Sequence, residues 1–136
     1  MSQANVEIVQ RGFTHFLTTG DFLAEIIAPD FVWDMSKFTG WPEQPAYEGI
    51  EGARSFIADW RGAWDDWQLD VEAFHDAGDK VVVAIHQRGR SKTTGMPVDM
   101  YFAQVFTLRD GKIVRLRLCQ DKETALEAVA RAPAHG

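Results

Sequence analysis

The sequence predicts a single α+β domain in which helices come first and strands follow. Three observations support this prediction. Apolar residues recur every three or four positions over residues 4–18 and 50–63, the spacing of helices that bury one face. From Trp67 onward the apolar spacing changes to every second residue, which is typical of strands. Between residues 98 and 120, two alternating apolar runs flank Asp110-Gly111, the strongest short signal for a β-hairpin.

Composition narrows the class of protein. The chain has 136 residues, 46% of them apolar and 25% charged, which fits one globular domain over residues 1–131 and a disordered tail over 132–136. The net charge of -6 argues against a nucleic-acid partner. No apolar run approaches the ~20 residues of a membrane span, and the first residues lack a signal-peptide core. The single cysteine, Cys119, excludes an internal disulfide, so we expect a cytoplasmic protein.

The N-terminal third of the chain is predicted to be mostly helical. The first helix covers residues 4–18 and ends near Gly20. Asp21 can cap a short second helix over residues 22–27, and a strand follows over residues 31–35. The segment over residues 36–48 is rich in aromatic residues, glycine and proline, so a functional loop is predicted there.

The rest of the chain is predicted to form a third helix, four strands and a final helix. A third helix over residues 50–63 has an apolar stripe formed by Ala53, Phe56, Ile57, Trp60 and Trp64. Strands are predicted over residues 67–77 and 80–92, with a turn at Gly78 between them. The hairpin over residues 98–120 comes next, and a final helix over residues 122–131 packs on the sheet.

The predicted hairpin has two faces, because side chains alternate along a strand. A two-residue turn pairs Leu108 with Ile113, Val105 with Leu116 and Ala103 with Leu118. One face then carries Tyr101, Ala103, Val105, Thr107, Val114, Leu116, Leu118 and Gln120. The other carries Phe102, Gln104, Phe106, Leu108, Ile113, Arg115, Arg117 and Cys119. Both faces are too apolar to face water, so each must be covered.

Four stretches together resemble one known family. They are TTGD after the first helix, YEGIEGARSFIADW, HDAGDKVVVAIHQRGRSKTTG and VFTLRDGKIVRLRLCQDKETALEA. With them the chain resembles the SnoaL-like branch of the nuclear-transport-factor-2-like superfamily. The resemblance implies a cone-shaped fold, in which a curved antiparallel sheet is wrapped around the N-terminal helices. A central apolar pocket lies between the sheet and the helices. This fold hosts isomerases, dehydratases, epoxide hydrolases, polyketide cyclases and non-catalytic dimers, so it implies no single reaction.

The resemblance also assigns a role to each hairpin face. The concave face would line a pocket for a small apolar, oxygenated molecule, with the residues Phe13, Trp33, Met35, Phe38, Trp41, Tyr47, Trp60, Trp64, Ile85, Gln87, Tyr101, Ala103, Leu116 and Leu118. The convex face would form a homodimer through Phe102, Gln104, Phe106, Arg115 and Arg117. The alternative for the aromatic residues is that they are plain core.

Two catalytic mechanisms of the superfamily find no matching residues. The positions that align with the ketosteroid-isomerase acids are Phe13, Ala103 and Met35. Those that align with the Asp–Arg–Asp set of the limonene-epoxide-hydrolase relatives are Gln87, Ile85 and Leu118. The four histidines are too scattered for a metal site, and neither a metal nor a cofactor is expected.

Three polar residues remain as candidates for a catalytic role: Tyr101, Gln87 and Gln120. Alternatively they satisfy one another or bound water. His86 and Arg88 alternate onto the convex face, where a polar interface rim is the simpler interpretation. Three functions therefore stay open: a cofactor-independent cyclase, isomerase or dehydratase, a non-catalytic ligand carrier or sensor, and a dimeric interaction module.

Overall fold

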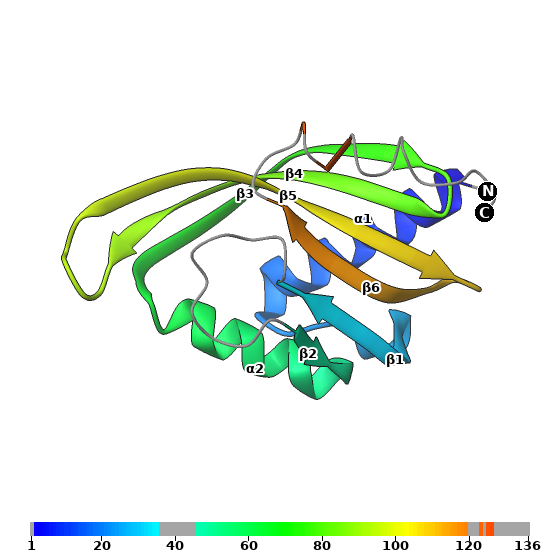
Figure 1. Cartoon of the computed structure of the whole chain (residues 1–136), viewed down its shortest axis with the longest axis horizontal. Helices are drawn as coiled ribbons and strands as arrows, with labels where there is room; N and C mark the ends of the chain where they lie inside the picture. The colour runs from blue at the N-terminus through cyan, green and yellow to red at the C-terminus, as the bar shows by residue number, and fades with distance from the viewer. Residues whose placement is uncertain (1, 36–45, 120–122, 124, 127–136) are drawn as a thin grey trace.

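Two helices lie against the inner side of a curved, six-stranded sheet (Figure 1). The computed structural model describes residues 2–35, 46–119, 123, 125 and 126. The helices are α1 (Ser2–Thr19) and α2 (Gly49–Arg61). The strands are β1 (Ile27–Asp34), β2 (Ala46–Glu48), β3 (Trp64–Ala77), β4 (Lys80–Ser91), β5 (Pro97–Arg109) and β6 (Lys112–Cys119). The predicted α+β fold with a curved sheet is confirmed.

The sheet has the strand order β2-β1-β6-β5-β4-β3. Neighbouring strands are antiparallel except β1 and β6, which run parallel and bring the first strand beside the last. The sequence pattern predicts a wholly antiparallel sheet and places no strand at residues 46–48, so β2 and the parallel pair are corrections. Both depend on where β1 docks, which local patterning does not specify. The predicted loop residues 36–45 lie outside the described residues.

The helices end and pack as their sequences suggest. Gly20 has a φ of +82°, and its N–H donates to the Phe16 carbonyl at 2.8 Å, closing α1 with a left-handed residue. The buried residues of α2 are Ala53, Phe56 and Trp60, part of the predicted stripe. No described helix is long and apolar enough to cross a membrane.

The predicted second helix is only one 3₁₀ turn, Ala24–Ile26. The backbone is already extended at Ile27, where β1 begins. Pro29 lies two residues further on and disfavours helical conformation in the residue before it. The helix therefore has too few residues to form a second turn.

The β5–β6 hairpin contains a β-bulge that the sequence pattern does not reveal. Asp110 and Gly111 both have positive φ values, 54° and 77°, as a type I′ turn requires. Leu108 pairs with Ile113 as predicted, but the register shifts by one at the next position, where Thr107 pairs with Arg115. Val114 is the extra residue. The predicted pairs Val105–Leu116 and Ala103–Leu118 are therefore wrong: Phe106 pairs with Leu116, and Gln104 with Leu118.

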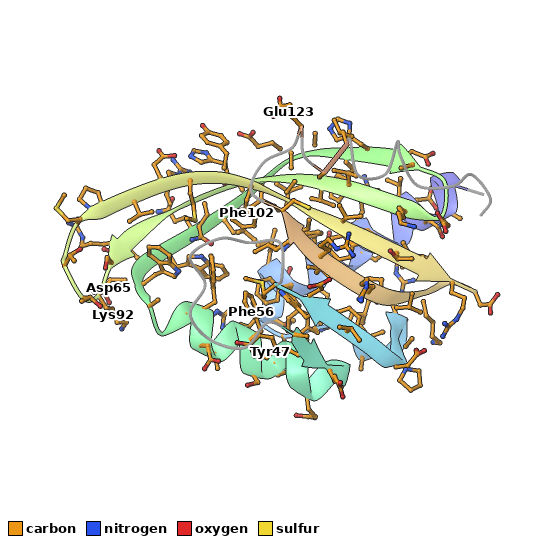
Figure 2. The ribbon with its side chains drawn as sticks, viewed as in Figure 1. Tyr47, Phe56, Asp65, Lys92, Phe102 and Glu123 are labelled. Carbon is orange, nitrogen blue, oxygen red and sulfur yellow. The ribbon has the colours of Figure 1, made fainter. Side chains whose placement is uncertain are left out.

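This one-residue shift changes which β5 side chains face the helices. Phe102 and Phe106 belong to the main core with Leu116 and Leu118, on the side of the sheet that faces α2 (Figure 2). The opposite, convex face buries a smaller cluster, in which Ala125 and Leu126 cover Val82, Ala103, Val105 and Cys119. A slip of one residue exchanges the faces of a strand. The predicted dimer face is accordingly wrong for Phe102, Gln104 and Phe106.

An ion pair ties the end of α1 to α2 and should make stability depend on pH. Asp21 accepts two hydrogen bonds from the Arg54 guanidinium, at 3.0 and 3.2 Å. Arg54 and, less strongly, the Phe22 N–H hold the pKa of Asp21 below its ordinary value. A lowered carboxyl pKa stabilises the fold above the unfolded-state pKa of about 3.9 and loses that effect as pH falls through the folded-state pKa.

We therefore expect Asp21→Asn to lower the urea midpoint at pH 7, and the difference from the original chain to shrink toward pH ~2 as Asp21 becomes protonated. The effect is small, because the pair is about half exposed. Urea unfolding at both pH values measures it. Since asparagine can still accept the Phe22 N–H, an equal gap at both pH values would show that the charge is not responsible.

Candidate functional site

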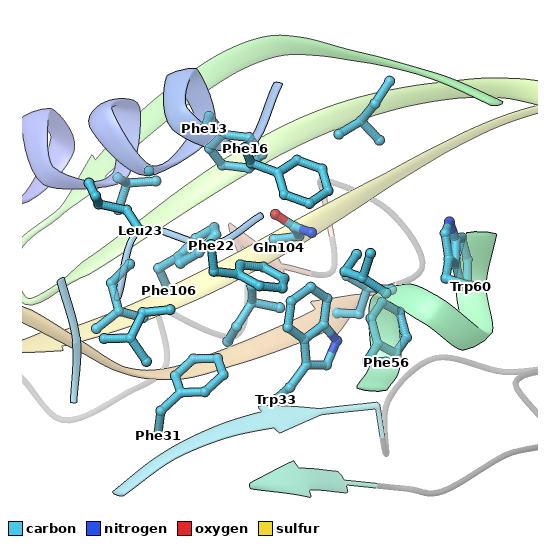
Figure 3. Close-up of a pocket in the computed structure, with 18 of the residues that line it drawn as sticks. Phe13, Phe16, Phe22, Leu23, Phe31, Trp33, Phe56, Trp60, Gln104 and Phe106 are labelled. Carbon is cyan, nitrogen blue, oxygen red and sulfur yellow. The ribbon is translucent and has the colours of Figure 1, made fainter. Parts of the chain in front are cut away.

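A cavity of about 90 Å³ lies between the helices and the concave face of the sheet (Figure 3). Ten of its described lining residues are aromatic: Phe13, Phe16, Phe22, Phe31, Trp33, Phe56, Trp60, Trp67, Phe102 and Phe106. Aliphatic residues and Gly12 make up most of the remainder, namely Val9, Gly12, Leu23, Ile26, Ile27, Ile57, Leu69, Ile113, Leu116 and Leu118. Two amides, Gln87 and Gln104, complete the described lining. A mostly apolar wall with a few polar groups is typical of small-molecule sites.

The aromatic wall is built from rings that hold one another in place. Trp33 stacks on Phe56 with a centroid distance of 4.4 Å, and Phe22 meets the Trp33 ring edge-on at 5.9 Å. The Trp33 indole N–H points to the Met35 sulfur at 3.3 Å. Its polar atom is therefore already engaged, and Trp33 offers the cavity only apolar surface.

Gln87 is fixed in one orientation by a hydrogen bond across the core. It is 1% exposed, and its Oε1 accepts the Trp60 indole N–H at 2.7 Å. Its Nε2 lies 3.5 Å from the Met100 sulfur, a weak acceptor. The amide therefore holds Trp60 in place and has its carbonyl occupied.

Gln104 differs from Gln87, because its carbonyl has no hydrogen-bond partner within the described part of the chain. Its side chain extends from β5, and Figure 3 shows the amide in the space that the rings enclose, with Phe16 on one side of it and Trp33 on the other in that view. The residue is 7% exposed, and its Oε1 is buried without a hydrogen-bond partner among the described residues. The indole N–H of Trp67, a second lining residue, is also buried without such a partner.

The described lining contains no carboxylate, histidine, lysine, arginine or tyrosine. Within all the residues that the structure describes, no group of three or more His, Cys, Asp or Glu side chains is placed to hold a metal. The described lining can therefore exclude water, position a ligand by its shape and form hydrogen bonds through two amides. It supplies no side chain that could transfer a proton near neutral pH.

The structure distributes the described residues of the predicted pocket over three environments. Those in the lining are Phe13, Trp33, Trp60, Gln87, Leu116 and Leu118. Those that pack in the core without lining the cavity are Met35, Tyr47, Trp64 and Ile85. Tyr101 and Ala103 lie on the convex side of the sheet, and Phe38, Trp41 and Gln120 lie outside the described residues.

The predictions for Tyr101 and Ala103 are corrected by the bulge. Tyr101 is 60% exposed, and its ring stacks on the His86 ring at a centroid distance of 4.2 Å. His86 Nε2 lies 2.6 Å from an Asp99 carboxylate oxygen. Tyr101 therefore belongs to a polar group on the convex face, where His86 is predicted to lie, and cannot reach the cavity.

The two arginines of the predicted dimer face lie beside a carboxylate. Arg117 donates to Asp34 Oδ2 at 3.3 Å, and Arg115 lies 3.9 Å from the same atom. Asp34 is only 7% exposed. It is the residue after Trp33, which lines the cavity, along β1. The apolar part of the predicted interface, however, is in the interior, so the homodimer stays a prediction that the resemblance alone supports.

The register correction does not restore either catalytic mechanism. Ala103 gives way to Gln104 as the inward-facing residue, and neither has a carboxyl group. The inward positions Ile85, Gln87 and Leu118 likewise have no ionisable group.

Sequence reasoning missed Gln104 and several phenylalanines of the cavity wall. Phe102, Gln104 and Phe106 alternate along β5, so a lone glutamine between two buried rings was the available signal. Phe16, Phe22 and Phe56 belonged to predicted helices, but their direction depends on how those helices dock.

Comparisons with known proteins place this geometry in one family. The family model described as SnoaL-like domain matches residues 9–116. Two of the similar solved structures are more than 25% identical to the chain. One, assigned to the SnoaL-like polyketide cyclases of Jannaschia sp. CCS1, is 27% identical with a TM-score of 0.69 and covers 97% of this chain and 95% of its own. The other, a nuclear-transport-factor-2-like protein of Burkholderia thailandensis E264, is 26% identical with a TM-score of 0.75 and covers 94% and 97%.

A further structure, TerC co-crystallised with polyporic acid, is 22% identical with a TM-score of 0.71 and covers 93% of this chain and 98% of its own. At that identity it shows a shared fold. A search among curated proteins finds no significant match. Because the family model spans most of the chain, the protein belongs to the SnoaL-like domain family.

Proposed function

We propose that this protein binds a small, neutral, aromatic and oxygenated molecule in the cavity between its helices and the concave face of the sheet. The observation that carries the proposal is the composition of the described lining, which has ten aromatic rings and only two polar side chains, both uncharged amides. Burying a charged ligand there would cost several kcal/mol, because no counter-charge lines the described wall. The site therefore selects neutral ligands.

Cavity size restricts the ligand further. About 90 Å³ is less than the roughly 150 Å³ of an engineered cavity that holds benzene in another protein. A single-ring ligand therefore requires the wall to expand, and several fused rings would require a larger expansion. Any reaction would depend on positioning, which can by itself lower a barrier substantially.

The test is ligand binding measured by saturation-transfer NMR and calorimetry with anisole and benzoate. Anisole should bind with a dissociation constant on the order of 1 mM, and benzoate at least tenfold more weakly, because only benzoate is charged. Failure of anisole to bind, or equal binding of both, would contradict the proposal.

A cavity-filling variant localises the binding. Leu116 is 4% exposed and lines the cavity, so Leu116→Trp should remove anisole binding by occupying the space. The matched control is Leu17→Trp, the same substitution at a 54% exposed position outside the described lining, which should leave binding unchanged. Circular dichroism and melting check folding, and Leu118→Phe replaces Leu116→Trp if the latter does not fold. Anisole binding that persists in a folded, filled variant would place the ligand elsewhere.

A second candidate is an enzyme of the polyketide-cyclase type. It is favoured by the relative in Jannaschia sp. CCS1, which is assigned to that activity and is 27% identical. Against it stands the absence of an ionisable side chain from the described lining. Incubation with a linear aromatic polyketide and analysis of the products by mass spectrometry decides between them. Cyclised product above the uncatalysed level would favour the enzyme, and binding without product would favour a carrier or sensor.

A further inference from the structure

Gln104 is the one described polar side chain of the cavity whose acceptor is both buried and unused. Trp33 directs its N–H to Met35, and the Gln87 carbonyl is occupied by Trp60. Gln104 Oε1 is buried and has no hydrogen-bond partner among the described residues. The residue as a whole is only 7% exposed. Leaving such a buried group unpaired is unfavourable, because it has lost its hydrogen bond to water. An acceptor that has no partner among the described residues, on a side chain that lines a cavity, is therefore a group that a ligand or a water molecule should satisfy.

We propose that the ligand of this cavity carries a hydroxyl group on its ring, and that Gln104 Oε1 accepts the hydrogen bond of that hydroxyl. The inference rests on the proposed function and specifies its ligand class as a neutral phenol. A carbonyl or ether oxygen on the ligand has no hydrogen to donate, so it cannot satisfy Oε1. A phenolate would bring a charge into the apolar wall, so the neutral phenol is the form that binds.

A hydroxyl group can also accept a hydrogen bond from the Trp67 indole N–H, the other lining group without a partner among the described residues. It can donate one hydrogen bond and accept others, so the same chemical group could satisfy either the Gln104 carbonyl or the Trp67 N–H. An apolar ligand without oxygen would leave both atoms unpaired. Shape then fixes the ring among the phenylalanines, and Gln104 fixes the direction in which the hydroxyl points.

The test compares phenol, anisole and acetophenone by calorimetry, with the chain and with Gln104→Met. Methionine has a similar shape and lacks the carbonyl. We expect the preference for phenol over anisole, taken as the ratio of their dissociation constants, to fall roughly tenfold in Gln104→Met while anisole still binds. Tyr101→Phe, which removes a hydroxyl on the convex face, should leave the ratio unchanged.

The outcomes separate this inference from the proposed function. If anisole does not bind the unaltered chain, the proposed function fails. If anisole binds but Gln104→Met leaves the phenol preference unchanged, only the hydroxyl inference is overturned, and water is the better account of what satisfies Oε1. If the variant loses preference for acetophenone instead, the amide presents its N–H to the ligand, and the inference is again overturned. Should Gln104→Met not fold, Gln104→Leu gives the same comparison.

Discussion

Replacing Phe102 with alanine should lower the free energy of unfolding by about 3–5 kcal/mol, whereas the same change at Tyr101 should cost less than about 1.5 kcal/mol. Phe102 is 5% exposed and contacts the Trp60 ring at a centroid distance of 6.2 Å. Tyr101 is 60% exposed and loses mainly its stacking on His86. The two residues are adjacent aromatics in one strand, so each serves as the control for the other.

Urea unfolding monitored by circular dichroism measures both free energies. The comparison tests the bulge at Val114 directly, because an unbroken two-residue period would place Tyr101 inside and Phe102 outside. A larger loss at Tyr101 than at Phe102 would mean that β5 and β6 pair in the regular register. The position of Gln104 in the cavity would then be wrong as well.

The second large effect concerns the hydrogen bond between Trp60 and Gln87. Trp60→Phe should cost at least about 1–3 kcal/mol, because it leaves a carbonyl unpaired at a residue that is 1% exposed. Gln87→Met should cost a similar amount, because it removes the carbonyl that accepts the Trp60 N–H. The double variant should lose less than the sum of the two, since replacing both partners removes the unpaired group.

The control for this cycle is Trp64→Phe. The Trp64 indole N–H is buried without a hydrogen-bond partner among the described residues, so its removal costs only ring contacts. Its free-energy loss should therefore be smaller than that of Trp60→Phe. Strict additivity in the Trp60–Gln87 double variant would show that the bond contributes nothing beyond packing.

The cavity explains why the family assignment does not itself name a reaction. The fold supplies a space between helices and sheet, and the side chains decide what that space can do. In this chain the described wall provides shape, aromatic surface and two amides. These features support recognition of a neutral ring more directly than they support acid–base chemistry.

The sequence by itself determined the fold class and most element positions. Helical spacing predicted α1 and α2, and the change of period at Trp67 predicted the strands from β3 onward. Asp110-Gly111 predicted the hairpin and the Leu108–Ile113 pair. These features depend on local periodicity and turn chemistry, which the order of residues contains.

Only the tertiary structure decided which side chains face the cavity. One extra residue, Val114, reverses the faces of β5 relative to β6 and moves Phe102, Gln104 and Phe106 into the interior. A bulge is a small local deformation whose position depends on how the whole sheet curves, so a two-residue pattern cannot locate it. The parallel pairing of β1 with β6 is likewise a long-range choice. The Gln104 carbonyl has no partner among the described residues because the bulge turns its side chain into a wall made mostly of hydrocarbon.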